Sequence, residues 1–144
     1  MLEKFLGTPY PITNTPKGLL PTQGGVNQIK SDLLCLLLTN PGERVMLPAF
    51  GTPLRDLIFD PNDSTLVEKA REMIINSIKL WEPRITTEQI DVFVGAEDDS
   101  LSPDDLKQDI EHILTVRIIF SDPENIQSVQ QLVLQMPLAS QGAS

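Results

Sequence analysis

The chain has 144 residues, the length of a single domain that can bury a hydrophobic core of its own. Hydrophobic residues make up 40% of it and charged residues 22%, a balance typical of folded globular proteins. Eleven basic residues stand against twenty acidic ones, which gives a formal net charge of -9. Because contacts to phosphate groups need Lys or Arg, this charge argues against a nucleic-acid partner and against an anionic membrane surface.

Cys35 is the only cysteine, so the chain cannot form an internal disulfide. It lies in an apolar run over residues 33–38, where the expected role is that of a small buried side chain. That run is far shorter than the roughly twenty residues that span a bilayer. Residues 1–7 also lack the basic start and long apolar stretch of a secretion signal. We therefore expect a soluble protein that is made in the cytoplasm and has no membrane partner.

The first part of the chain, residues 1–23, is interrupted by proline at Pro9, Pro11, Pro16 and Pro21. Proline fixes φ and removes a backbone donor, which predicts an extended and irregular arm. Residues 24–138 are expected to form a single folded domain. Residues 139–144 are small and polar, which is typical of a frayed tail.

A first helix is predicted over residues 26–39. Apolar residues recur there at steps of three and four, at Val26, Ile29, Leu33, Leu36 and Leu37. The helix should end at residues 40–42, because Pro41 pushes the residue before it out of the helical region and Gly42 favours a turn.

Two further helices are predicted before residue 84. Pro53 suits the first turn of a short helix. A longer helix is expected from Thr65 to Trp81, with Thr65 and Glu68 as a capping box at its start. Pro83 should end it.

After residue 84 the apolar period changes from that of a helix to two, which indicates strands over residues 90–94, 114–120 and 132–136. Three strands in sequence, joined by residues 95–109 and 122–127, favour an antiparallel meander. The predicted fold class is therefore α+β, with N-terminal helices packed on a three-stranded antiparallel sheet. A long apolar edge strand in such a small sheet must be covered or must accept a strand from another chain.

The sequence gives no support for a metal or cofactor site. His112 is the only histidine, and no Cys, Asp or Glu stands at ligand spacing from it. The acidic stretch at residues 98–105 lacks the central glycine and closing glutamate of an EF-hand loop, so an exposed acidic loop is expected. No nucleophile elbow and no phosphate-binding glycine loop is present.

One enzymatic alternative stays open, a glycosidase that degrades peptidoglycan. Glu82 lies beside Trp81 and could act as the acid, with Asp91 as the second carboxylate. Such pairs are common in acidic proteins, and aromatic residues, which stack on sugars, make up only 5% of the chain. We therefore expect no catalytic residue.

Two polar clusters follow helices and have no specific chemistry by themselves. Pro41-Gly42-Glu43-Arg44 follows the first predicted helix and is interpreted as a turn with a Glu–Arg pair. Glu82-Pro83-Arg84 closes the long helix. Its proline stiffens the backbone and is expected to direct both charges outward from one corner of the molecule.

As a pattern, these clusters resemble the signature of a contractile-tail family. The resemblance covers residues 37–51 and 54–61, and Glu82-Pro83-Arg84 matches the family's Glu-Pro-Arg motif between helix and first strand. The family comprises phage baseplate wedge proteins similar to the T-even sheath initiator, together with the related baseplate subunit of type VI secretion. The match extends from about Gly24 to Met136, and nothing is carried over to the arm or to residues 97–109.

The resemblance implies a structural protein and not an enzyme. It implies that Glu82, Pro83 and Arg84 dock on the core of the baseplate wedge. It gives a structural role to the motif residues Pro41, Gly42, Glu43, Arg44 and Gly51. It also implies that the last strand, through Val133, Leu134, Gln135 and Met136, pairs with an extended arm of a sheath subunit.

The same resemblance implies the partners and the location. Wedge core proteins and the tail sheath subunit are the expected partners, with tube or hub proteins as further candidates. Six copies around the tail axis are expected, in the baseplate of a virion tail whose subunits are made in the host cytoplasm. The lysozyme name given to some relatives has no support from the residues, and a free-standing adaptor remains a third class.

Overall fold

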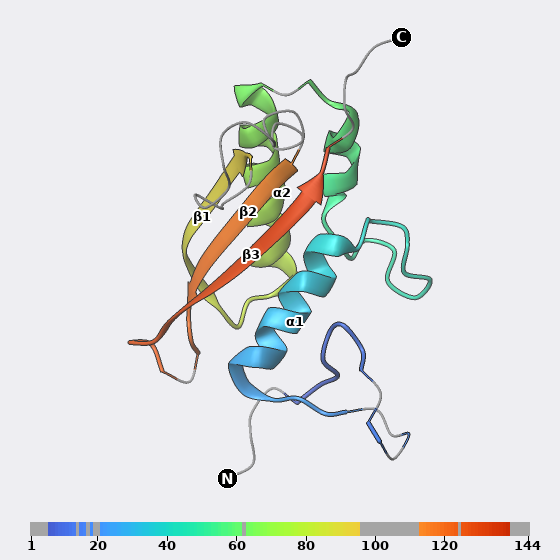
Figure 1. Ribbon diagram of the computed structural model, residues 1–144, viewed down its shortest axis with the longest axis vertical. Coiled ribbons are helices and arrows are strands. Elements are labelled where there is room, and N and C mark those ends of the chain that lie inside the picture. The colour runs from blue at the N-terminus through green and yellow to red at the C-terminus, as the bar shows by residue number, and fades with distance from the viewer. Residues whose placement is uncertain are drawn as a thin grey trace, which may run out of the picture.

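The computed structural model describes residues 6–13, 15–16, 18, 21–61, 63–95, 113–123 and 125–138. Helices come first along the chain and strands follow (Figure 1). The elements are α1 (Gly25–Leu38), the 3-10 helix η1 (Pro53–Phe59), α2 (Ser64–Trp81), β1 (Thr86–Val94), β2 (Ile113–Ser121) and β3 (Val129–Pro137). This order confirms the predicted α+β class.

The three strands form one antiparallel sheet in the order β1-β2-β3, which confirms the predicted meander. Val92, Val116 and Leu134 lie opposite one another across the sheet, and all three side chains are buried. In Figure 1, α2 passes behind the strands. Its apolar face and the even-numbered side chains of the strands belong to one core, to which α1 and η1 also contribute.

Helix α1 begins and ends close to where its apolar spacing predicts. Leu33 and Leu36 are almost fully buried, and the helix packs against α2. At its end, Thr39 leaves the helical region, and its backbone N–H and its Oγ1 both donate to the carbonyl oxygen of Cys35. These bonds satisfy a terminal carbonyl that would otherwise lack a partner.

Helix α2 starts earlier than predicted, and the predicted capping box is wrong. The cap is Asp63, whose carboxylate Oδ1 accepts a hydrogen bond of 3.0 Å from the backbone N–H of Leu66. Thr65 therefore lies inside the first turn. An aspartate is at least as good a cap as threonine, and it also places negative charge at the positive end of the helix. The end of α2 at Trp81, before Pro83, is as predicted.

Strand β1 is longer than its alternating segment because it begins with the polar residues Thr86 to Gln89. The pairing of β1 with β2 is interrupted between Thr87 and Gln89, where Glu88 is an extra residue. Such a bulge bends the strand locally and disturbs its ladder of hydrogen bonds. By contrast, β3 pairs with β2 in an unbroken register from Val129 to Pro137.

The described part of the N-terminal arm lies against the start of α1. Gly7 and Gln23 exchange two backbone hydrogen bonds of 2.8 Å, and Gln28 Nε2 on α1 donates to the carbonyl of Thr8. The apolar residues Tyr10 and Ile12 are exposed and do not anchor it. The expectations for residues 97–109, for His112 and for the tail at 139–144 lie outside the described residues.

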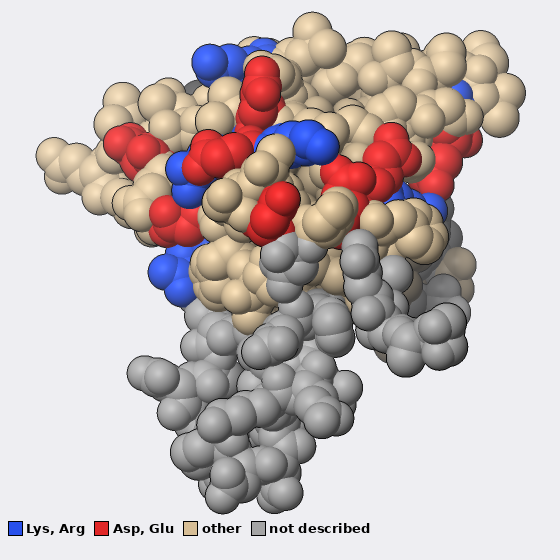
Figure 2. Space-filling view, turned by 90° about the horizontal axis from the view of Figure 1, so that it is seen from above, with Lys and Arg blue, Asp and Glu red and all other residues tan. Residues whose placement is uncertain are grey.

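The surface is charged on the face seen in Figure 2. Acidic and basic side chains are interspersed there, and the described part of that face carries no continuous basic patch.

Candidate interaction site

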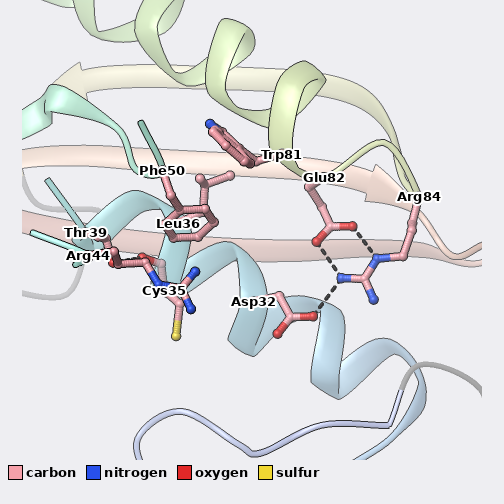
Figure 3. A pocket seen from close by; sticks show the side chains of 9 residues that line it. All are labelled: Asp32, Cys35, Leu36, Thr39, Arg44, Phe50, Trp81, Glu82 and Arg84. Carbon is pink, nitrogen blue, oxygen red and sulfur yellow. Dashed lines mark hydrogen bonds and ion pairs between the residues drawn. The ribbon is translucent and has the colours of Figure 1, made fainter. Parts of the chain in front are cut away.

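A cavity of about 430 Å³ lies where the end of α1, the loop after it and the end of α2 meet (Figure 3). It is lined by Asp32, Cys35, Leu36, Thr39, Arg44, Phe50, Trp81, Glu82 and Arg84. The two polar clusters that the sequence singles out are thus brought to one place, since Arg44 comes from the first and Glu82 and Arg84 come from the second.

Glu82, Arg84 and Asp32 form the charged side of this cavity. Arg84 Nε donates to Glu82 Oε1 and Arg84 Nη2 donates to Glu82 Oε2, each at 2.5 Å. The same Nη2 donates to Asp32 Oδ2 at 2.7 Å, as the dashed lines of Figure 3 show. Because Asp32 belongs to α1 and Glu82 follows α2, the guanidinium joins the two helices.

The expectation that both charges point outward is wrong for Glu82. Only 5% of this residue is exposed, whereas the Arg84 side chain is about one-third exposed. A buried carboxylate is costly unless charged donors satisfy it, and the planar fork of an arginine does this with two bonds. The backbone turns at Pro83 so that Arg84 can fold back over Glu82.

The ion pairs hold Arg84 in its charged form. Hydrogen bonding to Glu82 is the main cause that raises the pKa of Arg84 above its ordinary value. Burial acts in the opposite direction, and the bond to Asp32 adds to the rise. Arg84 is therefore a fixed cation whose side chain remains about one-third exposed.

Aromatic and apolar groups form the other side of the cavity. The rings of Phe50 and Trp81 meet edge to face with centroids 5.4 Å apart, and the guanidinium of Arg44 lies 4.5 Å from the centroid of Phe50. Cys35 is half-buried and not fully buried as expected. Burial raises the pKa of its thiol, the charge of Asp32 adds to this, and Arg44 opposes it. The thiol is thus not activated as a nucleophile.

Gly51 closes the loop between α1 and η1 by a close backbone approach. Its φ is +128°, and a Cβ at this position would collide with the carbonyl oxygen of Thr39. Next to it, the backbone N–H of Thr52 donates to that same oxygen at 2.9 Å, and Ser77 Oγ on α2 donates to the carbonyl of Gly51. Only glycine can occupy such a position without displacing the backbone.

The other motif residues shape the start of this loop. Gly42 has a φ of +95°, and its N–H donates to the carbonyl of Pro48 at 2.7 Å. Glu43 accepts a hydrogen bond from the backbone N–H of Asn40 at 3.0 Å and forms an ion pair of 2.8 Å with Arg55. These are the contacts of a structural turn, although Glu43 pairs with Arg55 and not with its neighbour in the motif.

The remaining predicted site lies elsewhere, at the edge of the sheet. Leu134 and Met136 are buried against the core, whereas Val133 is half-buried and Gln135 is exposed. None of these residues lines the cavity described above. The predicted site residues therefore fall into two regions, a corner beside Arg84 and a strand at the sheet edge.

The two carboxylates of the glycosidase alternative do not line a common cavity. Both oxygens of Glu82 are occupied by Arg84, and Asp91 is absent from the cavity wall. Asp91 instead accepts two hydrogen bonds of 2.8 Å from Gln89. Within the described ranges no group of three or more His, Cys, Asp or Glu residues could hold a metal ion. In the same part of the chain no helix has the length and apolar character to cross a bilayer.

Sequence reasoning missed Asp32, the third member of the charged group. Its signal was a single carboxylate directly before the apolar run at residues 33–38. Such a charge on a largely apolar helix often marks a tertiary ion pair, but its partner, 52 positions away, is visible only in the fold.

Two solved structures share this fold. One is the crystal structure of a protein from Geobacter sulfurreducens named as a candidate tail lysozyme. Its TM-score is 0.60 at 24% identity, over 79% of this chain and 91% of that one. The other is a chain of the anti-feeding prophage baseplate, solved by cryo-electron microscopy. It has a TM-score of 0.60 at 18% identity, over 94% of this chain and 87% of that one.

The sequence comparisons point to a baseplate protein. The family model "Baseplate wedge protein gp25" matches residues 23–118. The curated baseplate wedge protein gp25 of Enterobacteria phage T4 is 27% identical over 112 residues, which are 78% of this chain and 75% of that protein. The chain therefore belongs to the baseplate wedge protein gp25 family, and the resemblance found in the sequence is confirmed.

Replacement of Gly51 by alanine should destabilise the protein more than replacement of Gly42. At Gly51 an unfavourable φ adds to a collision with a pinned backbone carbonyl, and we expect a loss of roughly 2–4 kcal/mol. At Gly42 no atom lies within 4 Å of the added Cβ, so only the backbone strain remains, about 1–2 kcal/mol. Urea unfolding of both variants measures the difference, and equal losses would contradict the close approach.

Arg84→Ala should lower the free energy of unfolding by about 2–3 kcal/mol, because it leaves the buried Glu82 carboxylate without a cation. The matched control Asp32→Ala removes a partly exposed partner and should cost about 0–1 kcal/mol. In a Glu82→Gln background the loss caused by Arg84→Ala should shrink. Urea unfolding of the four variants checks this, and an undiminished loss in that background would show that the pair is not the cause.

Proposed function

We propose that this protein is a structural subunit of the baseplate wedge in a contractile tail, and that it starts sheath assembly by offering β3 to a sheath subunit. Membership of the gp25 family supports the baseplate role. The observation that carries the strand-addition part is the regular, uncharged edge strand β3. A second surface, the corner at Glu82-Pro83-Arg84, docks the protein on the wedge core.

The two edges of the sheet differ in how well they can accept a strand. On β1 the ladder is broken by the bulge at Glu88, and the carboxylates of Glu88 and Asp91 accompany it. Bulges and charges are the devices by which proteins protect their sheet edges. Strand β3 has no bulge and no charged side chain from Val129 to Pro137. Its backbone is thus the one suited to pair with an extended arm.

The corner beside Arg84 has the properties of a docking site. The guanidinium is held in place by Glu82 and Asp32, so little side-chain freedom is lost when a partner binds. About a third of the Arg84 side chain remains exposed toward the cavity and the solvent. A carboxylate or a backbone carbonyl of a wedge protein is the kind of group that would lie against the exposed part of this cation.

The assembly proposed here has six copies around the tail axis. The similar fold in the anti-feeding prophage comes from a baseplate reconstruction with six-fold symmetry, which supports this number. Partners are wedge core proteins and the sheath subunit, with tube or hub proteins as further neighbours. The location is the baseplate of the tail, with synthesis in the host cytoplasm.

A peptidoglycan glycosidase is the second candidate function, because a structure of the same fold carries the name of a candidate tail lysozyme. The described residues favour the structural role. Both oxygens of Glu82 are engaged by Arg84, and Asp32, the other carboxylate that lines this cavity, is bonded to the same arginine.

Proline substitutions in β3 test the strand-addition role. Along a strand the N–H groups of neighbouring residues point to opposite sides, so Gln130→Pro and Gln135→Pro remove donors on different sides of β3. One variant should lose a bond to β2 and melt at a lower temperature. The other should melt close to wild type yet fail to co-sediment with sheath subunits. Normal sheath binding by the variant that stays folded would contradict strand addition at β3.

An activity assay separates the two candidate functions. Purified protein should release no detectable sugar or peptide from peptidoglycan, and Glu82→Gln should behave as wild type does, because Glu82 serves as a partner of Arg84. Hen lysozyme serves as the positive control. Turnover by the wild type that disappears in Glu82→Gln would establish the glycosidase instead.

A further inference from the structure

The loop between α1 and η1 carries three apolar side chains at its tip. Val45 is 94% exposed, Met46 is 93% exposed and Leu47 is 39% exposed. We call these three residues the apolar tip. In Figure 1 the loop extends away from the helices and the sheet. The tip therefore adds nothing to the hydrophobic core.

The base of this loop is fixed although its tip is exposed. Gly42 N–H donates to the carbonyl of Pro48, and Phe50 N–H donates to that of Leu47 at 3.1 Å. The ion pair of Glu43 with Arg55 and the packing of Arg44 on Phe50 hold its flanks. A loop held in this way presents its tip in one arrangement, so binding would order few further groups.

The charges beside the tip are already engaged within the chain. Glu43 is paired with Arg55, and the guanidinium of Arg44 lies over the ring of Phe50. What the tip offers to a partner is thus apolar surface, which is uncommon on an exposed loop and marks an interaction site. A pocket of apolar side chains is the complement that it fits.

We propose that the apolar tip is an anchor that inserts into an apolar pocket of a baseplate wedge protein. This inference rests on the proposed baseplate function. The tip lies on the loop that forms part of the docking corner, because Arg44 and Phe50 on either side of it line the cavity beside Arg84. A partner seated on that cavity would reach the tip of the same loop. The anchor and Arg84 then bind one partner, the first by apolar burial and the second by polar contacts.

The test compares two double variants at exposed apolar positions. Val45→Ser with Met46→Ser should melt as the wild type does, since both side chains are in water, and should bind at least tenfold more weakly to wedge proteins of the same tail purified without this chain. The matched control, Phe59→Ser with Ile126→Ser, removes side chains that are 78% and 80% exposed elsewhere and should bind normally. Equal binding by both double variants would overturn the proposal.

A cross-linking experiment identifies the occupant. A photoreactive amino acid at position 46 should cross-link to a wedge protein in assembled baseplates, and the same group at position 126 should give far less of that product. Cross-links at position 46 that join only copies of this chain would overturn the proposal in favour of self-association. Binding to phosphatidylglycerol vesicles that depends on Met46 would overturn it in favour of a lipid contact.

Binding of the wild type and of the double variant to wedge proteins separates the role of the tip from that of the whole protein. If the wild type binds wedge proteins and the Val45, Met46 double variant binds as tightly, only the anchor is wrong. If the wild type itself does not bind wedge proteins, the baseplate docking role is wrong, and the anchor with it.

Discussion

The buried carboxylate of Glu82 is the constraint on which the arrangement of the helices depends. It lies at the junction of α2 and β1, where it cannot be solvated, and Arg84 must therefore fold back to pair with it. In that position the guanidinium also reaches Asp32 on α1. One cation thus fixes the end of one helix to the middle of another, and the cavity between them follows from this connection.

The loop after α1 depends on a second constraint, the close passage of Gly51 over the carbonyl of Thr39. That passage joins the end of α1 to η1, and the bond from Ser77 ties it to α2. The loop is therefore attached to both helices at its base. Its ring contact, Phe50 against Trp81, completes the wall of the same cavity. The two polar motifs of the sequence are consequently parts of one corner and not separate features.

Much of the fold could be predicted from apolar spacing, because one buried face leaves a period in the sequence of each helix and strand. The start of α2 could not be predicted as well, since Asp63 and Thr65 are both plausible caps and local sequence does not decide between them. The orientation of the charged side chains of Glu82 and Arg84 after α2 could not be predicted either. Whether Glu82 faces solvent depends on α1, which lies about fifty positions earlier and supplies Asp32. The spacing of apolar residues indicates which side chains are buried in helices and strands. It does not indicate which residues, distant in sequence, contact one another in the folded chain.

The two edges of the sheet differ, and this difference limits how an assembly could grow by strand pairing. A sheet with two receptive edges can grow from both sides and form an open-ended fibre. Here the ladder of β1 is broken at Glu88, while that of β3 is regular throughout. If β3 accepts a strand as proposed above, growth by pairing is favoured at that edge only. A sheet of this kind would start an ordered series of subunits without joining two series together, so its geometry would give the proposed assembly a beginning and a polarity.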